Sequence, residues 1–248
     1  MKLSHSVSLV SIFLLFSPAS FTQQKTLKKE ELYIGVKAII VLGVEDLVNA
    51  SIEANRTTRL KHMNETYSRG DGFRVTVSSQ AQLADAINNE CRQLVKNTTF
   101  TDEKERIYVM AFADSMIQAS LAGLSFAKVI TKKQSDSVRT IMQEERAISG
   151  AKRIEGDTRP QVSPKELVKE LSERLQADGI LNCSFQYGKN KNGKDVIYLT
   201  ARIVDANAQM LWQNIVEVNT IVLRDKPKDV FVHNKIQKAV VKVFKPLK

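Results

Sequence analysis

The hydrophobic pattern is most regular between Ser163 and Val218, where it predicts one helix followed by three strands. Ser163 and Glu166 have the spacing of a capping box, and Pro164 stands at the first helical position, where the missing N–H costs nothing. The apolar residues that follow recur at helical spacing: Leu167, Val168, Leu171 and Leu175. One helix face is therefore predicted to be buried, with Gly179 ending the helix.

Beyond that helix the pattern changes from helical spacing to alternation. Short strands are predicted over Ile180–Phe185, Val196–Val204 and Met210–Val218, separated by polar turns that include Asn192-Gly193. In the middle strand the apolar face is Ile197, Leu199, Ala201 and Ile203, and the polar face is Tyr198, Thr200 and Arg202. This favours a sheet with one face packed on helices and the other partly wet.

The upstream half has the same mixture of elements. Apolar runs predict the strands Ala38–Leu42, Phe73–Val77, Ile107–Phe112 and Phe126–Ile130. Helical spacing predicts helices over 45–67, 80–95, 116–124, 135–148 and 230–244. The fold class is therefore α/β, with a mixed sheet flanked by helices.

Two segments of the upstream half resemble each other. Residues 39–46 and 107–114 are both apolar runs followed by an aspartate, and 73–90 and 126–145 both read strand, polar turn, amphipathic helix. Either two related strand–helix units are present or two α/β units look alike by chance. The domain prediction is one α/β domain over 32–248, in one piece or as two lobes, 32–149 and 163–248, joined by a loop at 150–162.

The amino terminus has the pattern of a secretory signal peptide. Lys2 precedes an apolar run from Val7 to Phe16, and small residues follow it at 17–20. We therefore assign 1–22 to a signal peptide and 23–31 to a polar, flexible start; an uncleaved signal anchor is the alternative. No cysteine stands directly after the apolar run, so the chain is expected to be exported without a lipid anchor.

The chain is basic, with a net charge of +10. The signal peptide argues against a nucleic-acid partner. The basic charge either makes an ordinary soluble surface or serves acidic envelope partners: anionic lipids, lipopolysaccharide or wall polymers. The last predicted helix carries a basic face made of Lys235, Lys238, Lys242 and Lys245. Such a helix either lies on a membrane surface or packs its apolar side on the core and leaves the lysines in solvent.

Candidate chemistry is sparse. Cys91 and Cys183 are far apart in the sequence, and they either form one disulfide or remain two buried free thiols. His62 and His233 stand alone, and no hydrolase, phosphate-loop or zinc motif is present. We therefore expect no catalytic residues, no metal and no cofactor, with an unrecognised hydrolase as a minor alternative.

Three segments carry a family resemblance. Leu175–Leu181 (Leu-Gln-Ala-Asp-Gly-Ile-Leu), Ala201–Asp205 and Leu211-Trp212 resemble a pattern in the bacterial envelope family of CsgG, LpoB and the amino-terminal domain of TolB. Ala208-Gln209 stands where that family has Thr-Gly. The resemblance implies an α/β envelope protein, periplasmic or associated with the outer membrane.

The expected function is that of a non-enzymatic accessory protein that binds another protein of an envelope assembly, of secretion, cell-wall synthase or flagellar type, with oligomers among its partners. Two turns are expected to supply the contacts, through Lys189, Asn190, Asn192, Asp205 and Asn207. The alternative is a membrane-surface or polyanion binder that uses the basic carboxy-terminal helix.

Overall fold

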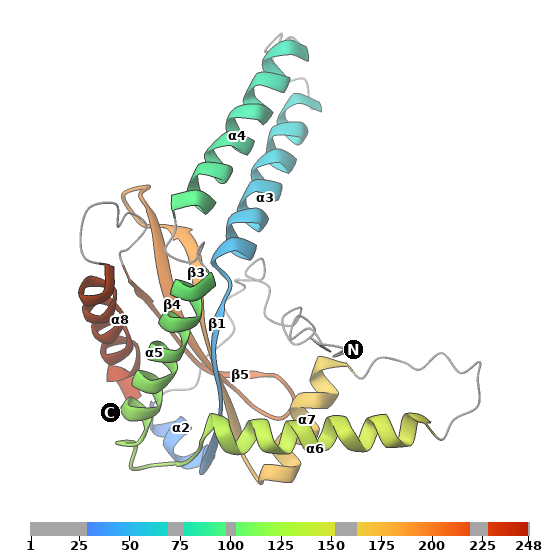
Figure 1. Ribbon diagram of the computed structural model, residues 1–248, viewed down its shortest axis with the longest axis vertical. Helices are drawn as coiled ribbons and strands as arrows, with labels where there is room; N and C mark the ends of the chain where they lie inside the picture. The colour runs from blue at the N-terminus through green and yellow to red at the C-terminus, as the bar shows by residue number, and fades with distance from the viewer. Residues whose placement is uncertain (1–28, 69–76, 98–102, 152–162, 219–227, 248) are drawn as a thin grey trace.

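A computed structural model describes residues 29–68, 77–97, 103–151, 163–218 and 228–247 (Figure 1). Its strands are β1 (Ala38–Asp46), β2 (Lys128–Ile130), β3 (Gly179–Lys189), β4 (Asp195–Val204) and β5 (Met210–Glu217). Its helices are α2 (Lys29–Gly35), α3 (Val48–Ser68), α4 (Val77–Asn97), α5 (Glu103–Leu121), α6 (Lys132–Ala151), α7 (Pro164–Leu175) and α8 (Lys228–Phe244), followed by the short η2 (Lys245–Leu247). The predicted signal peptide, 1–22, and most of the loop at 150–162 lie outside these residues.

The strands form one mixed sheet in the order β2-β1-β3-β4-β5. β1 runs parallel to both β2 and β3, whereas β4 is antiparallel to its two neighbours. Strands from 32–149 and from 163–248 therefore belong to the same sheet. The predicted α/β class, with a mixed sheet flanked by helices, is confirmed.

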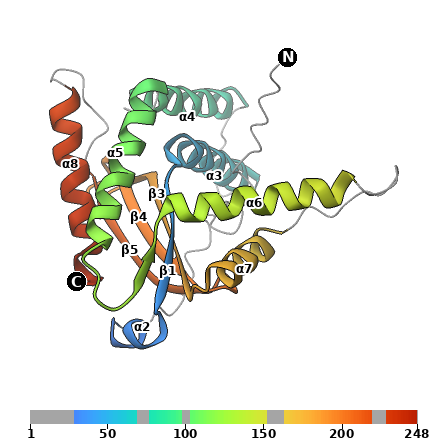
Figure 2. The ribbon, with the colours of Figure 1, turned by 60° about the horizontal axis from the view of Figure 1, so that its bottom comes forward.

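Helices cover the sheet on both faces (Figures 1 and 2). Ile39 of β1 joins a large apolar cluster with α2, α5 and α8, whereas the next residue, Ile40, joins a smaller cluster with α6 and α7. This alternation follows from the period of two along a strand. Buried on both sides, β1 reads as the continuous apolar run seen in the sequence.

The predicted start of α7 is confirmed in detail. The Ser163 hydroxyl accepts from the Glu166 N–H at 3.2 Å, and the Glu166 carboxylate accepts from the Ser163 N–H at 2.8 Å. The end of the helix differs from the prediction, because Gln176, with φ 49°, takes the left-handed position. Gly179 lies in β3 instead, where an added Cβ would come within 2.9 Å of the Ile203 side chain. This glycine therefore allows the strands to approach closely.

The predicted strand Ile107–Phe112 is wrong, because these residues lie in the middle of the helix α5. The buried positions of α5 include Val109, Ala113, Ile117 and Leu121, which recur every fourth residue. Ile107 and Tyr108 are exposed at 59% and 50%. A continuous apolar run conceals a helical stripe of this kind, since neighbouring apolar residues need not share a face. Residues 39–46 and 107–114 therefore resemble each other in sequence only, because the first segment is a strand and the second is a helix.

The alternation predicted for β4 is confirmed on its apolar face, where Ile197, Leu199, Ala201 and Ile203 all lie in the large cluster. The opposite face is less wet than predicted. Thr200 and Arg202 are buried there, as are their partners across the ladder, Ser184 and Asn182. We call these residues the polar strip. Burial lowers the pKa of the Arg202 guanidinium.

Candidate functional site

The longest extension from the sheet is a hairpin made of α3 and α4 (Figure 1). α3 begins where β1 ends, and the Asp46 carboxylate caps it by accepting from the Val48 N–H at 2.9 Å. The base of α3 is then fixed to β3, because the Ser51 hydroxyl accepts from the Tyr187 N–H at 2.7 Å. Asp114, which ends the similar run 107–114 in the sequence, lies inside α5 instead.

Polar contacts hold the two helices of the hairpin together. Arg59 of α3 and Glu90 of α4 form an ion pair at 2.8 Å, and Arg56 donates to the Asn88 side chain at 2.9 Å. The hydrogen bond from Arg59 lowers the pKa of Glu90. The Glu90 carboxylate also lies 3.8 Å from the ammonium of Lys189, the last residue of β3. The hairpin base is therefore tied to the β3–β4 turn.

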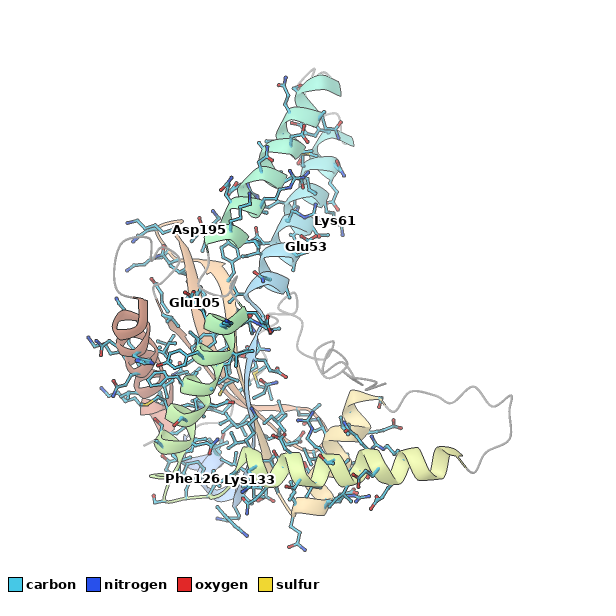
Figure 3. All side chains as sticks on the ribbon, viewed as in Figure 1. Glu53, Lys61, Glu105, Phe126, Lys133 and Asp195 are labelled. Atoms are coloured by element: carbon cyan, nitrogen blue, oxygen red, sulfur yellow. The ribbon has the colours of Figure 1, made fainter. Side chains whose placement is uncertain are left out.

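Burial within the hairpin is confined to its base. Val48 and Ile52 of α3 are buried, but no residue from Glu53 to Tyr67 is. On α4, Ile87, Cys91 and Leu94 are buried, whereas Leu83, further out, is 43% exposed. Each helix has 21 residues, which corresponds to roughly 30 Å. Figure 3 shows Glu53 and Lys61 along α3, level with Asp195 at the start of β4.

A groove of about 440 Å³ runs between the two helices at the base of the hairpin. We call it the hairpin groove. It is lined by Asn49, Ile52, Glu53 and Arg56 from α3 and by Asn88, Cys91, Arg92, Val95 and Lys96 from α4. Ile52 and Cys91 are buried and form an apolar floor, while Glu53, Arg92 and Lys96 are exposed on the rim. The groove thus combines an apolar floor with a charged edge.

A second polar region lies where β1 ends. Gly43 has φ 100° at an irregularity in the pairing of β1 with β3. There the Asp114 carboxylate accepts from the Val44 N–H at 2.6 Å and from the Lys132 ammonium at 2.7 Å. Asp114 of α5 therefore fixes both the bulge and the start of α6.

Glu45 lies beside this bulge and has a strongly perturbed carboxyl group. Burial is the largest effect and raises its pKa to about 7; the hydrogen bond from Asn182, at 3.2 Å, and the charges of Arg139 and Lys132 act in the opposite direction. Near neutral pH this group can take up or release a proton. It borders the polar strip through Asn182.

The two turns predicted to contact a partner lie at opposite ends of β4. Lys189 ends β3, and Asn190 and Asn192 follow it in the β3–β4 turn near the hairpin, whereas Asp205 and Asn207 belong to the β4–β5 turn. Side chains in both turns bind their own backbone: Asn190 accepts from the Lys194 N–H at 3.1 Å, and Asp205 from the Asn207 N–H at 2.8 Å. The five residues therefore do not form one surface.

The predicted lysines lie on α8, whose apolar side packs on the sheet. The buried residues of that side are Ile236, Ala239, Val240, Val243 and Phe244. Lys238 and Lys242 of α8 are exposed, as is Lys245, which begins η2, and Lys235 is half-buried. Of the two interpretations of this helix, the packing of its apolar side on the core is confirmed.

Cys91 and Cys183 are both free and buried, as in the free-thiol alternative. Burial raises the pKa of each thiol, which keeps them protonated and weakly reactive at neutral pH. Among the described residues, no group of three or more His, Cys, Asp or Glu side chains is arranged to hold a metal. Within the same residues, no helix has the length and apolar character needed to cross a membrane.

The spacing of apolar residues predicted both helices of the hairpin. It did not predict that they extend away from the sheet. Leu83 of α4 is exposed, and Leu60 and Met63 of α3 are only half-buried. The intervening strand predicted at 73–77 falls mostly outside the described residues, and its last residue, Val77, begins α4. Charged and polar residues dominate α3 after Ile52, and this composition could have predicted the exposure of its outer part.

No protein-family model matches the sequence, and no curated protein matches it. Similar solved structures include the LpoB C-terminal domain from Escherichia coli, with 7% identity and a TM-score of 0.31, covering 75% of this chain and 85% of that one. A PelC dodecamer from Paraburkholderia phytofirmans has 11% identity and a TM-score of 0.30, covering 91% and 93%. The lipoprotein GNA1162 from Neisseria meningitidis has 11% identity and a TM-score of 0.31, covering 83% and 96%. The chain thus bears a weak fold-level resemblance to these proteins, which establishes neither a family nor a function.

Proposed function

We propose that this protein is a non-enzymatic accessory protein of the cell envelope that binds a partner protein through the α3–α4 hairpin. The observation that carries the proposal is the confinement of burial to the hairpin base. Ordering a helix costs conformational entropy, and residues that stay exposed return little of it through burial within their own chain. Exposed side chains held on a rigid support are typical of binding surfaces.

Two further features support this proposal. The base of the hairpin is fixed by Asp46, Ser51 and the Arg59–Glu90 ion pair, so the helices are presented in a defined direction. The signal-peptide pattern at 1–22 favours export, which would place the partner in the envelope. Partners of secretion, cell-wall synthase or flagellar assemblies, including oligomers, are compatible with such a surface.

Site-specific photo-crosslinking tests the proposal. A photoreactive residue is placed at Lys61, which is exposed on α3, and in a second protein at Asn207, which is exposed in the β4–β5 turn. In native envelope extract we expect a discrete crosslinked product from position 61 and none from position 207. Products from 207 alone, or from neither position, would contradict the hairpin as the binding surface.

The outer face of α8 favours a second candidate function, binding to an anionic lipid or wall-polymer surface. Lys238, Lys242 and Lys245 are exposed there, with Val241 among them at 52% exposure. Because the apolar stripe is buried, such binding would depend on charge and would weaken as salt is raised. Vesicle co-sedimentation that is unchanged in Lys238→Glu/Lys242→Glu/Lys245→Glu protein would dismiss it.

A further inference from the structure

We propose that the hairpin groove receives an acidic amphipathic helix of the partner, an inference that rests on the partner-binding role of the hairpin. Its first support is shape. The lining residues of α3 lie at positions 49, 52, 53 and 56, and those of α4 at 88, 91, 92, 95 and 96. Both rows have the spacing of one helix face. Each row covers about two turns, on the order of 11 Å.

A groove between two helices of this length fits a third helix. Side chains of an incoming helix would enter between the two rows, as ridges enter grooves when helices pack. The apolar floor, Ile52 and Cys91, together with the half-buried Val95 beside it, would bury apolar anchors spaced three or four residues apart. A volume of about 440 Å³ is sufficient for a few such side chains, but not for a whole folded surface.

The charged residues on the rim of the groove determine whether an acidic or a basic helix would bind there. Arg56 is already engaged, because its guanidinium donates to both oxygens of the Glu53 carboxylate, at 3.0 and 2.9 Å. The hydrogen bond from Arg56 also lowers the pKa of Glu53, which keeps that carboxylate ionised. Arg92 and Lys96 then leave the groove with a net charge of about +2. Glutamate or aspartate beside the apolar anchors would complement these two cations.

The lysine at the end of α4 also has a local effect, since a cation in the last turn favours the helix dipole. That effect does not account for Arg92, which is a full turn earlier and exposed, and whose bond to Asn89 is long at 3.3 Å. Both cations line the same groove above the same apolar floor. The combination matches helix-in-groove recognition with charged flanks.

The test uses the full mature chain and two synthetic helical peptides of the same apolar pattern. One peptide carries Leu at i, i+3, i+4 and i+7 flanked by Glu, and the other carries Lys in place of Glu. Binding is measured by fluorescence anisotropy. We expect the acidic peptide to bind at least about tenfold more tightly than the basic one and to weaken about tenfold in Arg92→Glu/Lys96→Glu protein.

The matched control is Lys133→Glu/Lys165→Glu protein, which has the same change in net charge at exposed positions of α6 and α7, outside both proposed binding surfaces. Its affinity for the acidic peptide should stay within about twofold of the original. Alkylation of Cys91 provides a second readout: the bound peptide should slow it, while Cys183, buried in β3, reacts only on unfolding. Circular dichroism verifies that the variants are folded.

Several results would overturn the inference. They are absence of acidic-peptide binding at millimolar concentration, equal binding of the basic peptide, and equal loss in the Lys133→Glu/Lys165→Glu control. Binding to phosphatidylglycerol vesicles that disappears in Arg92→Glu/Lys96→Glu protein would assign the groove to lipid instead. Crosslinking from position 61 separates the two proposals: if it persists in Arg92→Glu/Lys96→Glu protein, the groove assignment fails while the hairpin remains the binding surface.

Discussion

Glu45 shows how burial can make one residue couple folding to pH. Its carboxyl group sits beside the β1 bulge with a pKa of about 7, so the folded protein favours the protonated form. In the unfolded chain the group ionises near 4.5. Stability is therefore unaffected below pH 4.5, falls as the pH rises toward 7, and stays reduced above it.

Replacing Glu45 with Gln removes this ionisation while keeping an amide oxygen to accept from Asn182. We expect the free energy of unfolding of Glu45→Gln protein, relative to the original, to rise by about 2 to 3 kcal/mol between pH 4.5 and pH 8. Urea denaturation at both pH values measures the difference. Glu217→Gln, on the exposed end of β5, is the control. An equal effect of Glu45→Gln at the two pH values would contradict the prediction.

Gly43 is the second residue whose identity the structure requires. Its φ of 100° is a conformation that side chains rarely adopt, and an added Cβ would lie 3.0 Å from the Lys132 side chain and 3.1 Å from the Asp114 carboxylate. Gly43→Ala should therefore lower the free energy of unfolding by about 2 kcal/mol. At Gly35, the last residue of α2, an added Cβ meets nothing within 4 Å, so Gly35→Ala should have little effect. Denaturation midpoints of both variants decide the matter.

At the scale of elements, the start of α7 is the best-defined signal in the chain. Its capping box was predicted from Ser163 and Glu166 alone because those atoms meet within one helical turn, whatever the rest of the chain does. The hairpin differs. Its two helices follow from local spacing, but their direction depends on β1 ending at Asp46 while β3 continues, and no short window of sequence contains that information.

Removing the Ser163 cap tests how much the capping box stabilises α7. Ser163→Ala leaves the Glu166 N–H without its acceptor and should cost about 1 kcal/mol of stability. The Ser137 hydroxyl, inside α6, donates to the carbonyl of Lys133, four residues earlier, at 3.0 Å. Ser137→Ala should therefore be neutral or slightly stabilising, since alanine favours helix interiors. Equal effects of both substitutions on thermal unfolding would show that the capping box contributes nothing.

Over the whole molecule, prediction succeeded where pattern and packing coincide. Alternation in β4 identified the face that meets α8, and the spacing of α8 identified its buried stripe. Prediction failed where the apolar stripe of a helix looks like a strand in the sequence, as in α5. It also failed where polar side chains are buried, as at Thr200 and Arg202. Neither the hairpin groove nor the acidity of Glu45 could be predicted, because both arise from residues that are distant in sequence.

The uneven burial also predicts uneven stability. Amides of β3 and β4, buried at the centre of the sheet, should exchange with solvent only on global unfolding. Amides of α3 from Glu53 to Tyr67, where no residue is buried, should exchange orders of magnitude faster. Hydrogen exchange followed by mass spectrometry measures both. Equal protection would mean that the hairpin is stabilised by something other than its own contacts.

The hairpin leaves the sheet between β1 and α5, and its outer turns contribute nothing to the buried clusters. Its length is consequently independent of the rest of the fold. Adding one turn to each helix would extend the reach of the molecule by about 5.4 Å and leave every strand pair in place. A longer or shorter hairpin would therefore be compatible with the same sheet and the same buried clusters.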